Sequence, residues 1–143
     1  MGAEPCFQET FSISGGDFSN AGEVSSKVKN ILQQLGVANK VIRRATIATY
    51  EAEMNVVWYA RKGTLILSVT PEMLHISVED EGEGIEDLEM AMKEGYSTAS
   101  PEIREMGFGA GMGLPNIKKN SDEFNIRSVV GQGTFVRFSI RRQ

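Results

Sequence analysis

The chain has 143 residues, 41% of them hydrophobic and 24% charged, and a formal net charge of -4; this excludes a disordered or fibrous chain and suits a single globular domain over residues 1–143. The acidic balance, without a basic face, argues against nucleic-acid binding. The single cysteine, Cys6, excludes an internal disulfide and a cysteine metal cluster, and the lack of a membrane-length apolar run or a signal pattern predicts a cytoplasmic protein outside the membrane.

The first part of the chain predicts one strand followed by two helices. Residues 7–13 alternate apolar and polar side chains, as a half-buried strand does. From 18 to 35 the apolar residues recur at helical spacing, and Gly36 is a suitable C-terminal stop. A second helix, long and mostly buried, is predicted over about residues 38–60, with Gly63 beyond its end.

The rest of the chain predicts two hairpins with short helices between them. Strands at 64–70 and 74–80 form the first hairpin, and strands at 124–130 and 134–140 form the second. Helices are expected near 87–92 and from about 114 to 120, while the span 94–113 has no clear periodicity and is expected to move. Helices and strands do not alternate strictly, which predicts an α+β two-layer sandwich: a mixed, mostly antiparallel sheet covered on one face by helices.

A glycine-rich run precedes the predicted helix at 114–120. Glycine occupies every second position, at Gly107, Gly109, Gly111 and Gly113, and the helix then begins at Leu114. The spacing fits neither a Rossmann fingerprint nor a Walker loop. Backbone N–H groups that lead into a helix N-terminus favour an anion such as phosphate. A flexible loop without a ligand explains the run equally well.

A second motif follows the strand predicted at 74–80. Asp80 ends that strand, and Gly82 and Gly84 leave space beside it. A carboxylate in this position can accept a hydrogen bond from an amino group such as that of adenine. The alternative is an acidic turn, which Asp and Gly also favour.

The long predicted helix carries a polar pair among apolar neighbours. Glu51 and Asn55 are four residues apart and therefore project from one face, about 6 Å from each other. The amide oxygen can bind a hard cation such as Mg²⁺, and the carboxylate can accept a proton. The alternative is a solvated helix edge, and Glu53 is the glutamate that we expect to be simply exposed.

In this order, the three motifs and the sequence GQGT at 131–134 resemble the GHKL ATPases, which include gyrases, heat-shock chaperones, mismatch-repair proteins and histidine kinases. The resemblance implies a Bergerat-type fold with ATP between the helices and a glycine-rich lid. It implies that Asn55 binds Mg²⁺, that Asp80 accepts from the adenine amino group, that Thr134 supports this contact, and that Glu51 is the general base. Gly82 and Gly84 would let the base approach, and the lid that donates N–H groups to the phosphates would comprise Gly107, Gly109, Gly111, Gly113 and Leu114.

Further features narrow the resemblance to one branch. We expect neither a second domain like that of gyrases nor a helical segment with a phosphoacceptor histidine, and we interpret His75 as an ordinary strand residue. Residues 94–128 are similar to the RsbT type among the small bacterial anti-sigma factors and switch kinases, a group that also includes RsbW and SpoIIAB. The segment after Asn55 departs from the pattern, because it lacks the histidine that anti-sigma kinases often carry there.

The resemblance implies a cytoplasmic ATP-dependent serine/threonine kinase that phosphorylates a STAS-domain partner of the anti-sigma antagonist kind. Two alternatives stay open: a nucleotide-gated module that sequesters a partner without phosphoryl transfer, and a domain that binds no nucleotide. A sigma factor as partner and pairing with a second copy of the chain also stay open. Six further residues have two possible roles each: contact with the nucleotide, or a place as a surface or structural group. They are Arg61, Lys62, Ser97, Thr98, Lys118 and Lys119.

Overall fold

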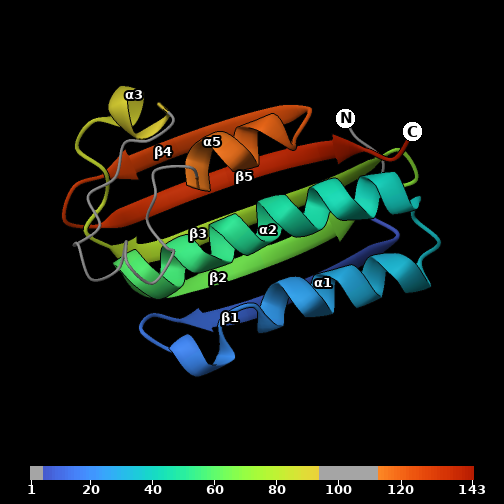
Figure 1. The fold of residues 1–143 in the computed structure, drawn as a ribbon, viewed down its shortest axis with the longest axis horizontal. Coiled ribbons are helices and arrows are strands. Elements are labelled where there is room, and N and C mark those ends of the chain that lie inside the picture. The colour runs from blue at the N-terminus through green and yellow to red at the C-terminus, as the bar shows by residue number, and fades with distance from the viewer. Residues whose placement is uncertain (1–4, 94–112) are drawn as a thin grey trace.

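The computed structural model describes residues 5–93 and 113–143 and contains one sheet with helices on one of its faces (Figure 1). The strands are β1 (Phe7–Ser14), β2 (Ala60–Val69), β3 (Met73–Gly82), β4 (Glu123–Val129) and β5 (Gly133–Arg141). They lie in the order β1-β2-β3-β5-β4. All neighbouring strands of this sheet pair antiparallel, so the described residues contain no parallel pair where a mixed sheet was expected.

The helices form the second layer. α1 (Glu23–Gln34), α2 (Asn39–Tyr59) and α5 (Gly113–Lys119) lie side by side over the same face of the sheet, with α2 in the middle (Figure 1). The short α3 (Leu88–Ala91) lies beyond the end of the sheet near β4. The predicted α+β two-layer sandwich is confirmed. Among the described ranges, no helix is both long enough and apolar enough to span a bilayer.

The core fills the space between the sheet and the three covering helices. On β3 the alternate residues Leu74, Ile76 and Val78 are buried, as expected for a strand with one covered face. α2 contributes buried residues at helical spacing, among them Ala48 and Ala52. This packing holds α2 along the middle of the sheet, and most of the candidate site lies on or beside this helix.

Two local predictions differ from the structure. The helix expected from residue 18 is interrupted: a 3-10 turn covers Phe18–Asn20, and α1 begins only after Gly22, whose φ of 95° lies in the left-handed region. β2 begins at Ala60, the residue after α2 ends, and not at residue 64 as expected, so Gly63 lies beyond the end of α2 as predicted but inside β2. His75 is a β3 residue as expected, and its Nδ1 lies 2.7 Å from the Ser139 hydroxyl.

Candidate active site

Glu51 and Asn55 are brought together on the side of α2 that faces α5. The Glu51 Oε2 atom accepts a hydrogen bond of 3.0 Å from the side-chain amide of Asn116, in α5. One turn further along α2, the Oδ1 atom of Asn55 would lie 3.3 Å from a Cβ placed on Gly113, the first residue of α5. The prediction that Glu51 and Asn55 share one face holds, and both side chains are half-buried under the start of α5.

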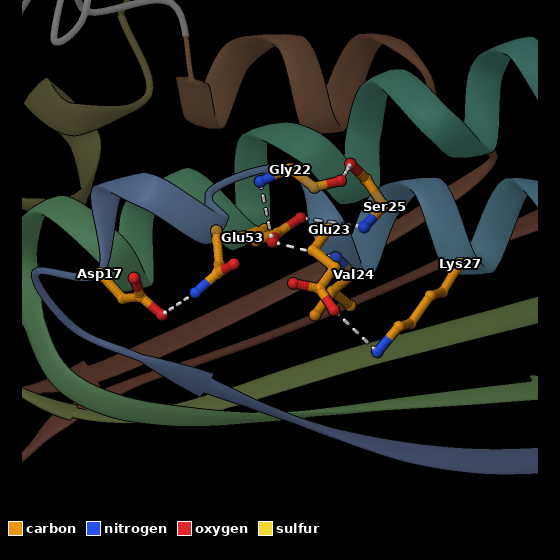
Figure 2. Close-up of polar contacts among 8 residues, drawn as sticks. Asp17, Gly22, Glu23, Val24, Ser25, Lys27 and Glu53 are labelled. Atoms are coloured by element: carbon orange, nitrogen blue, oxygen red, sulfur yellow. Dashed lines mark hydrogen bonds and ion pairs between the residues drawn. The ribbon is translucent and has the colours of Figure 1, made fainter.

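Glu53 is the one glutamate of this segment that we expected to be exposed, and that expectation is wrong. It is 2% exposed and buried among α1 and α2. Its carboxylate accepts three backbone hydrogen bonds, from the N–H groups of Gly22 (3.1 Å), Val24 (3.2 Å) and Ser25 (2.9 Å). Figure 2 shows this carboxylate pointing at the first turn of α1.

The reason for the burial of Glu53 is the start of α1. The first N–H groups of a helix have no partner within the helix, and they carry a partial positive charge. The N-cap residue is Gly22, which has no side chain that could accept from them. Glu53 therefore caps α1 from the neighbouring helix, and this contact fixes α1 against α2 beside the pocket described next.

An open pocket of about 340 Å³ lies beside Glu51, between α1, α2 and α5. Two of its residues, Ile47 and Tyr50, are 38% and 37% exposed and supply apolar surface at its edge. The pocket places a carboxylate next to hydroxyl, amide and apolar groups, which suits a side chain of another protein better than a free ion. Its lining residues are Ser25, Thr46, Ile47, Tyr50, Glu51 and Asn116.

Asp80 and Thr134 are brought together as predicted, at the end of the sheet where β3 ends and β5 begins. The Oδ1 atom of Asp80 accepts the backbone N–H of Thr134 at 3.0 Å. Burial raises the pKa of Asp80 above its ordinary value, and the Thr134 hydrogen bond opposes this rise. Within the described ranges, the Oδ2 atom of Asp80 has no hydrogen-bond partner. This half-buried carboxylate is therefore ready to accept from an amino group.

Ser128 is a residue of this region that sequence reasoning missed. Its hydroxyl accepts the N–H of Ile85 at 2.8 Å, donates to the Gly133 carbonyl at 3.1 Å, and lies 2.8 Å from the Thr134 hydroxyl. Because Ser128 has one proton and gives it to Gly133, the Thr134 hydroxyl donates to Ser128. The available signal was register: Ser128 and Thr134 face each other across the second hairpin.

Gly82 and Gly84 are close to the chain's own backbone on the side where a Cβ would point. A Cβ on Gly82 would lie 2.9 Å from the Tyr59 carbonyl oxygen, and one on Gly84 would lie 2.5 Å from that of Val129. Gly84 also has a φ of 76°. The prediction that these glycines let a base approach stays a prediction, because these contacts do not test it. On the Cβ side, α2 and β4 fill the space. Their local requirement therefore comes from the packing of the chain.

Four of the basic residues that we left unassigned lie within the described ranges. Lys62 forms an exposed ion pair with Glu81, with Nζ and Oε2 3.1 Å apart, and Arg61 beside it is exposed. Lys118 and Lys119 lie in the last turn of α5, at the opposite end from Gly113. Gly107, Gly109, Gly111, Ser97 and Thr98 lie outside the described residues.

The candidate site offers few protein ligands for a metal ion, and a Mg²⁺ ion needs only a few. Within the residues that the structure describes, no three or more His, Cys, Asp or Glu residues gather to hold a metal. Mg²⁺ in phosphoryl-transfer sites takes one or two protein ligands and completes its shell with phosphate oxygens and water. The amide oxygen of Asn55, half-buried beside Gly113, fits the role of such a single ligand.

Comparison with known proteins agrees with this geometry. The family model of the histidine kinase-like ATPase domain matches residues 17–140. The chain is 34% identical over 113 residues to the serine/threonine-protein kinase RsbT of Bacillus subtilis, covering 76% of this chain and 79% of that protein. It is 28% identical over 119 residues to an anti-sigma F factor of a Thermoanaerobacter species, covering 83% of this chain and 76% of that protein.

The fold also matches a solved structure. A chain in the crystal structure of the SiaB–SiaC complex from Pseudomonas aeruginosa superposes with a TM-score of 0.63, at 14% sequence identity, and the match covers 92% of this chain and 88% of that chain. At this identity the match concerns the fold alone. The family match and the relatives confirm the resemblance drawn from the motifs: the chain belongs to the histidine kinase-like ATPase domain family, in the group of small bacterial anti-sigma factors and switch kinases.

Proposed function

We propose that this chain is an ATP-dependent serine/threonine protein kinase of the anti-sigma or switch type. The observation that carries the proposal is the pairing of Glu51 and Asn55 on α2, both in contact with the start of α5, next to an open pocket. A carboxylate beside an amide and a pocket is the arrangement that a hydroxyl acceptor needs. The relatives, one of them named a serine/threonine-protein kinase, support this reading.

The nucleotide would lie along α2. Asp80 would accept from the adenine amino group through its Oδ2 atom, supported by Thr134, near the end of α2 where Gly82 approaches Tyr59. The phosphates would lie toward Asn55, which is one turn before that end of α2. Glu51 is one turn farther from the same end, about 6 Å from Asn55. We expect the lid, with Gly107, Gly109, Gly111, Gly113 and Leu114 as its residues, to donate backbone N–H groups to the phosphates.

In the transfer step, Glu51 would accept the proton of a serine or threonine hydroxyl of the partner. The hydroxyl oxygen forms a bond to the γ-phosphorus, and the bond from that phosphorus to the oxygen bridging the β- and γ-phosphates breaks, which releases ADP. A bound Mg²⁺ would offset the phosphate charge, with Asn55 as its protein ligand. Ile47 and Tyr50, at the edge of the pocket, would contact the segment that carries the acceptor hydroxyl.

The partner would be a cytoplasmic STAS-domain protein of the anti-sigma antagonist kind, and a sigma factor would be a second ligand. The support is indirect: one of the similar proteins is named a serine/threonine-protein kinase and another an anti-sigma F factor. The same names support a second candidate function, in which the chain binds its partner when loaded with nucleotide and transfers no phosphate.

One experiment separates these two functions. The tagged chain is used to capture partners from the native cell with and without Mg-ATP, and each captured protein is then purified and incubated with the chain and γ-labelled ATP. The kinase proposal expects label on a serine or threonine of a captured protein. Nucleotide-dependent capture without any transfer of label would contradict it and favour the binding module. A thermal shift with Mg-ATP is the control for nucleotide binding itself.

A further inference from the structure

The helix α5 meets α2 at two points that are one helical turn apart. Gly113 lies against Asn55, and Asn116 is hydrogen-bonded to Glu51. Glu51 contacts Asn116 and Asn55 contacts Gly113, so the residue number rises along α2 in the direction in which it falls along α5. The two helices therefore run in opposite directions, as Figure 1 also shows. The helix that follows the glycine-rich run therefore contacts both residues to which the proposed function gives a role at the phosphate end.

Asn116 is a firmly held donor. Its neighbours Pro115 and Ile117 are buried, and Ile117, which is 0% exposed, belongs to the core. Its carbonyl oxygen accepts both the backbone N–H of Asn120, at 3.2 Å, and the Asn120 side-chain amide, at 2.8 Å. The backbone of Asn116 is thus fixed from both sides, and its side-chain amide reaches Glu51 from a position that does not depend on Glu51.

Glu51 depends on this donor for its orientation. A glutamate side chain has three rotatable bonds and loses much freedom when it is fixed. The bond from Asn116 to Oε2 is the hydrogen bond that holds this carboxylate in the part of the chain that the structure describes, and it leaves Oε1 without such a partner there. Both side chains line the same pocket.

We propose that Asn116 is a positioning residue, which holds the Glu51 carboxylate so that Oε1 receives the proton of the acceptor hydroxyl in the pocket between α1, α2 and α5. The inference rests on the proposed kinase function and deepens it. Asn116 acts through Glu51 and has no role toward the nucleotide. Its removal should therefore slow phosphoryl transfer and leave the affinity for ATP as it is.

The experiment measures the steady-state rate at which the full chain transfers γ-labelled phosphate to the purified partner, as a function of ATP concentration. Asn116→Ala is expected to lower kcat about 10- to 100-fold, because a displacement of about 1 Å at a reacting group has effects of this size, with KM for ATP unchanged. Asn116→Asp matches the size of asparagine but presents a carboxylate oxygen to Glu51, so it should lose at least as much. Transfer by Asn116→Asp at the wild-type rate would mean that Asn116 only fills space, and would overturn the proposal.

Two comparisons distinguish positioning from loss of structure. Ser121→Ala removes the hydrogen bond of 3.1 Å from this hydroxyl to the Lys118 carbonyl, in the last turn of α5, without touching Asn116 or Glu51, and it should keep kcat. In a Glu51→Ala background, Asn116→Ala should cost nothing further, since a residue that acts through another is not additive with it. An equal loss in both backgrounds would contradict the proposal.

A second readout does not depend on catalysis. In ¹⁵N-labelled protein, the side-chain amide signal of Asn116 should shift in the Glu51→Ala variant, while that of Asn120 should stay. If the wild type transfers no phosphate, the proposed kinase function is wrong, and an unchanged Asn116 signal would separately show that the positioning contact does not form.

Discussion

The two glutamates of α2 are two residues apart and have different surroundings. Glu51 is half-buried, lies at the pocket and has a single hydrogen bond among the described residues. Glu53 is 2% exposed and accepts three backbone N–H groups of α1 and its N-cap. Because an α-helix turns about 100° per residue, side chains two apart point to nearly opposite sides. One side of α2 thus serves the structure, and the other is available for chemistry.

This difference teaches that the number of partners, more than the type of side chain, separates a structural carboxylate from a reactive one. Glu53 has its oxygens occupied by the helix start, so it is not free to accept a proton from a substrate. Glu51 keeps an oxygen without a partner among the described residues, beside a pocket open to solvent. The predictions below test this contrast.

The largest effect is expected for Glu51→Ala. Removal of a general base lowers the rate of transfer by about 10²- to 10⁴-fold, while ATP affinity and stability should stay near wild type because Asp80 and the core are unchanged. Rapid-quench measurement of label transfer and calorimetry of ATP binding check this. A Glu51→Ala variant that transfers phosphate normally would remove Glu51 from the chemistry.

Glu53→Ala should lower the stability of the fold and leave the transfer of phosphate in place, the reverse of Glu51→Ala. It leaves three N–H groups at the start of α1 without their acceptor, and we expect the free energy of unfolding to fall by about 3 kcal/mol. The measurement is urea denaturation, with Glu53→Gln as a milder control that keeps one acceptor oxygen. At a temperature where the variant is still folded, transfer should persist. Unchanged stability would mean that the cap on α1 is not important.

Asp80→Asn should weaken ATP binding by about 10-fold or more, because an amide presents a donor where an acceptor is needed, at a cost on the order of 1–3 kcal/mol. The variant should still fold, because the asparagine oxygen can accept the Thr134 N–H as Asp80 does. Titration calorimetry with ATP measures this effect. Wild-type affinity in this variant would contradict the adenine assignment.

The same variant predicts a pH dependence of stability. Burial raises the pKa of Asp80 above its ordinary value of 3.8, so the folded chain keeps this proton to a higher pH than the unfolded chain. The free energy of unfolding of the ligand-free wild type should therefore fall, relative to Asp80→Asn, as pH rises from about 3.8 through the raised pKa. Denaturation curves of both proteins across this range check the sign, and parallel pH profiles would refute it.

The smallest effect is expected for Lys62→Ala. The ion pair with Glu81 is exposed on both sides, so its loss should change the free energy of unfolding by no more than about 0.5 kcal/mol. The affinity for ATP should also stay, because the Lys62 side chain is exposed and paired with Glu81. A clear loss of ATP affinity would show that this lysine contacts the phosphates after all.

Local patterns in the sequence predicted much of this structure. The alternation of apolar and polar side chains predicted the bounds of the strands to within a few residues. Helical spacing placed Glu51 and Asn55 on one side of α2. Asp80 and Thr134 were paired by the order of motifs, and the structure brings them within hydrogen-bond distance. These features depend on neighbours in sequence or on a motif set that the family shares.

The features that the sequence did not predict depend on partners far along the chain. Glu53 is bound to N–H groups 28 to 31 residues away, and Asn116 is 65 residues from Glu51. Periodicity places a side chain on one side of a helix, but it does not say which other element will cover that side. The break before α1 was missed for a related reason: Gly22 begins a helix that lacks a side-chain cap of its own and takes one from α2.

The most direct test of the account follows one phosphate. Wild type, Glu51→Ala and Glu53→Gln are each incubated with the purified partner and Mg-ATP, and the intact mass of the partner is measured over time. We expect the partner to gain one phosphate on a serine or threonine with wild type and with Glu53→Gln, and none with Glu51→Ala on the same time scale. A partner that binds in the presence of Mg-ATP but never gains mass, or gains it equally with Glu51→Ala, would contradict the assignment of Glu51 as the base of a kinase.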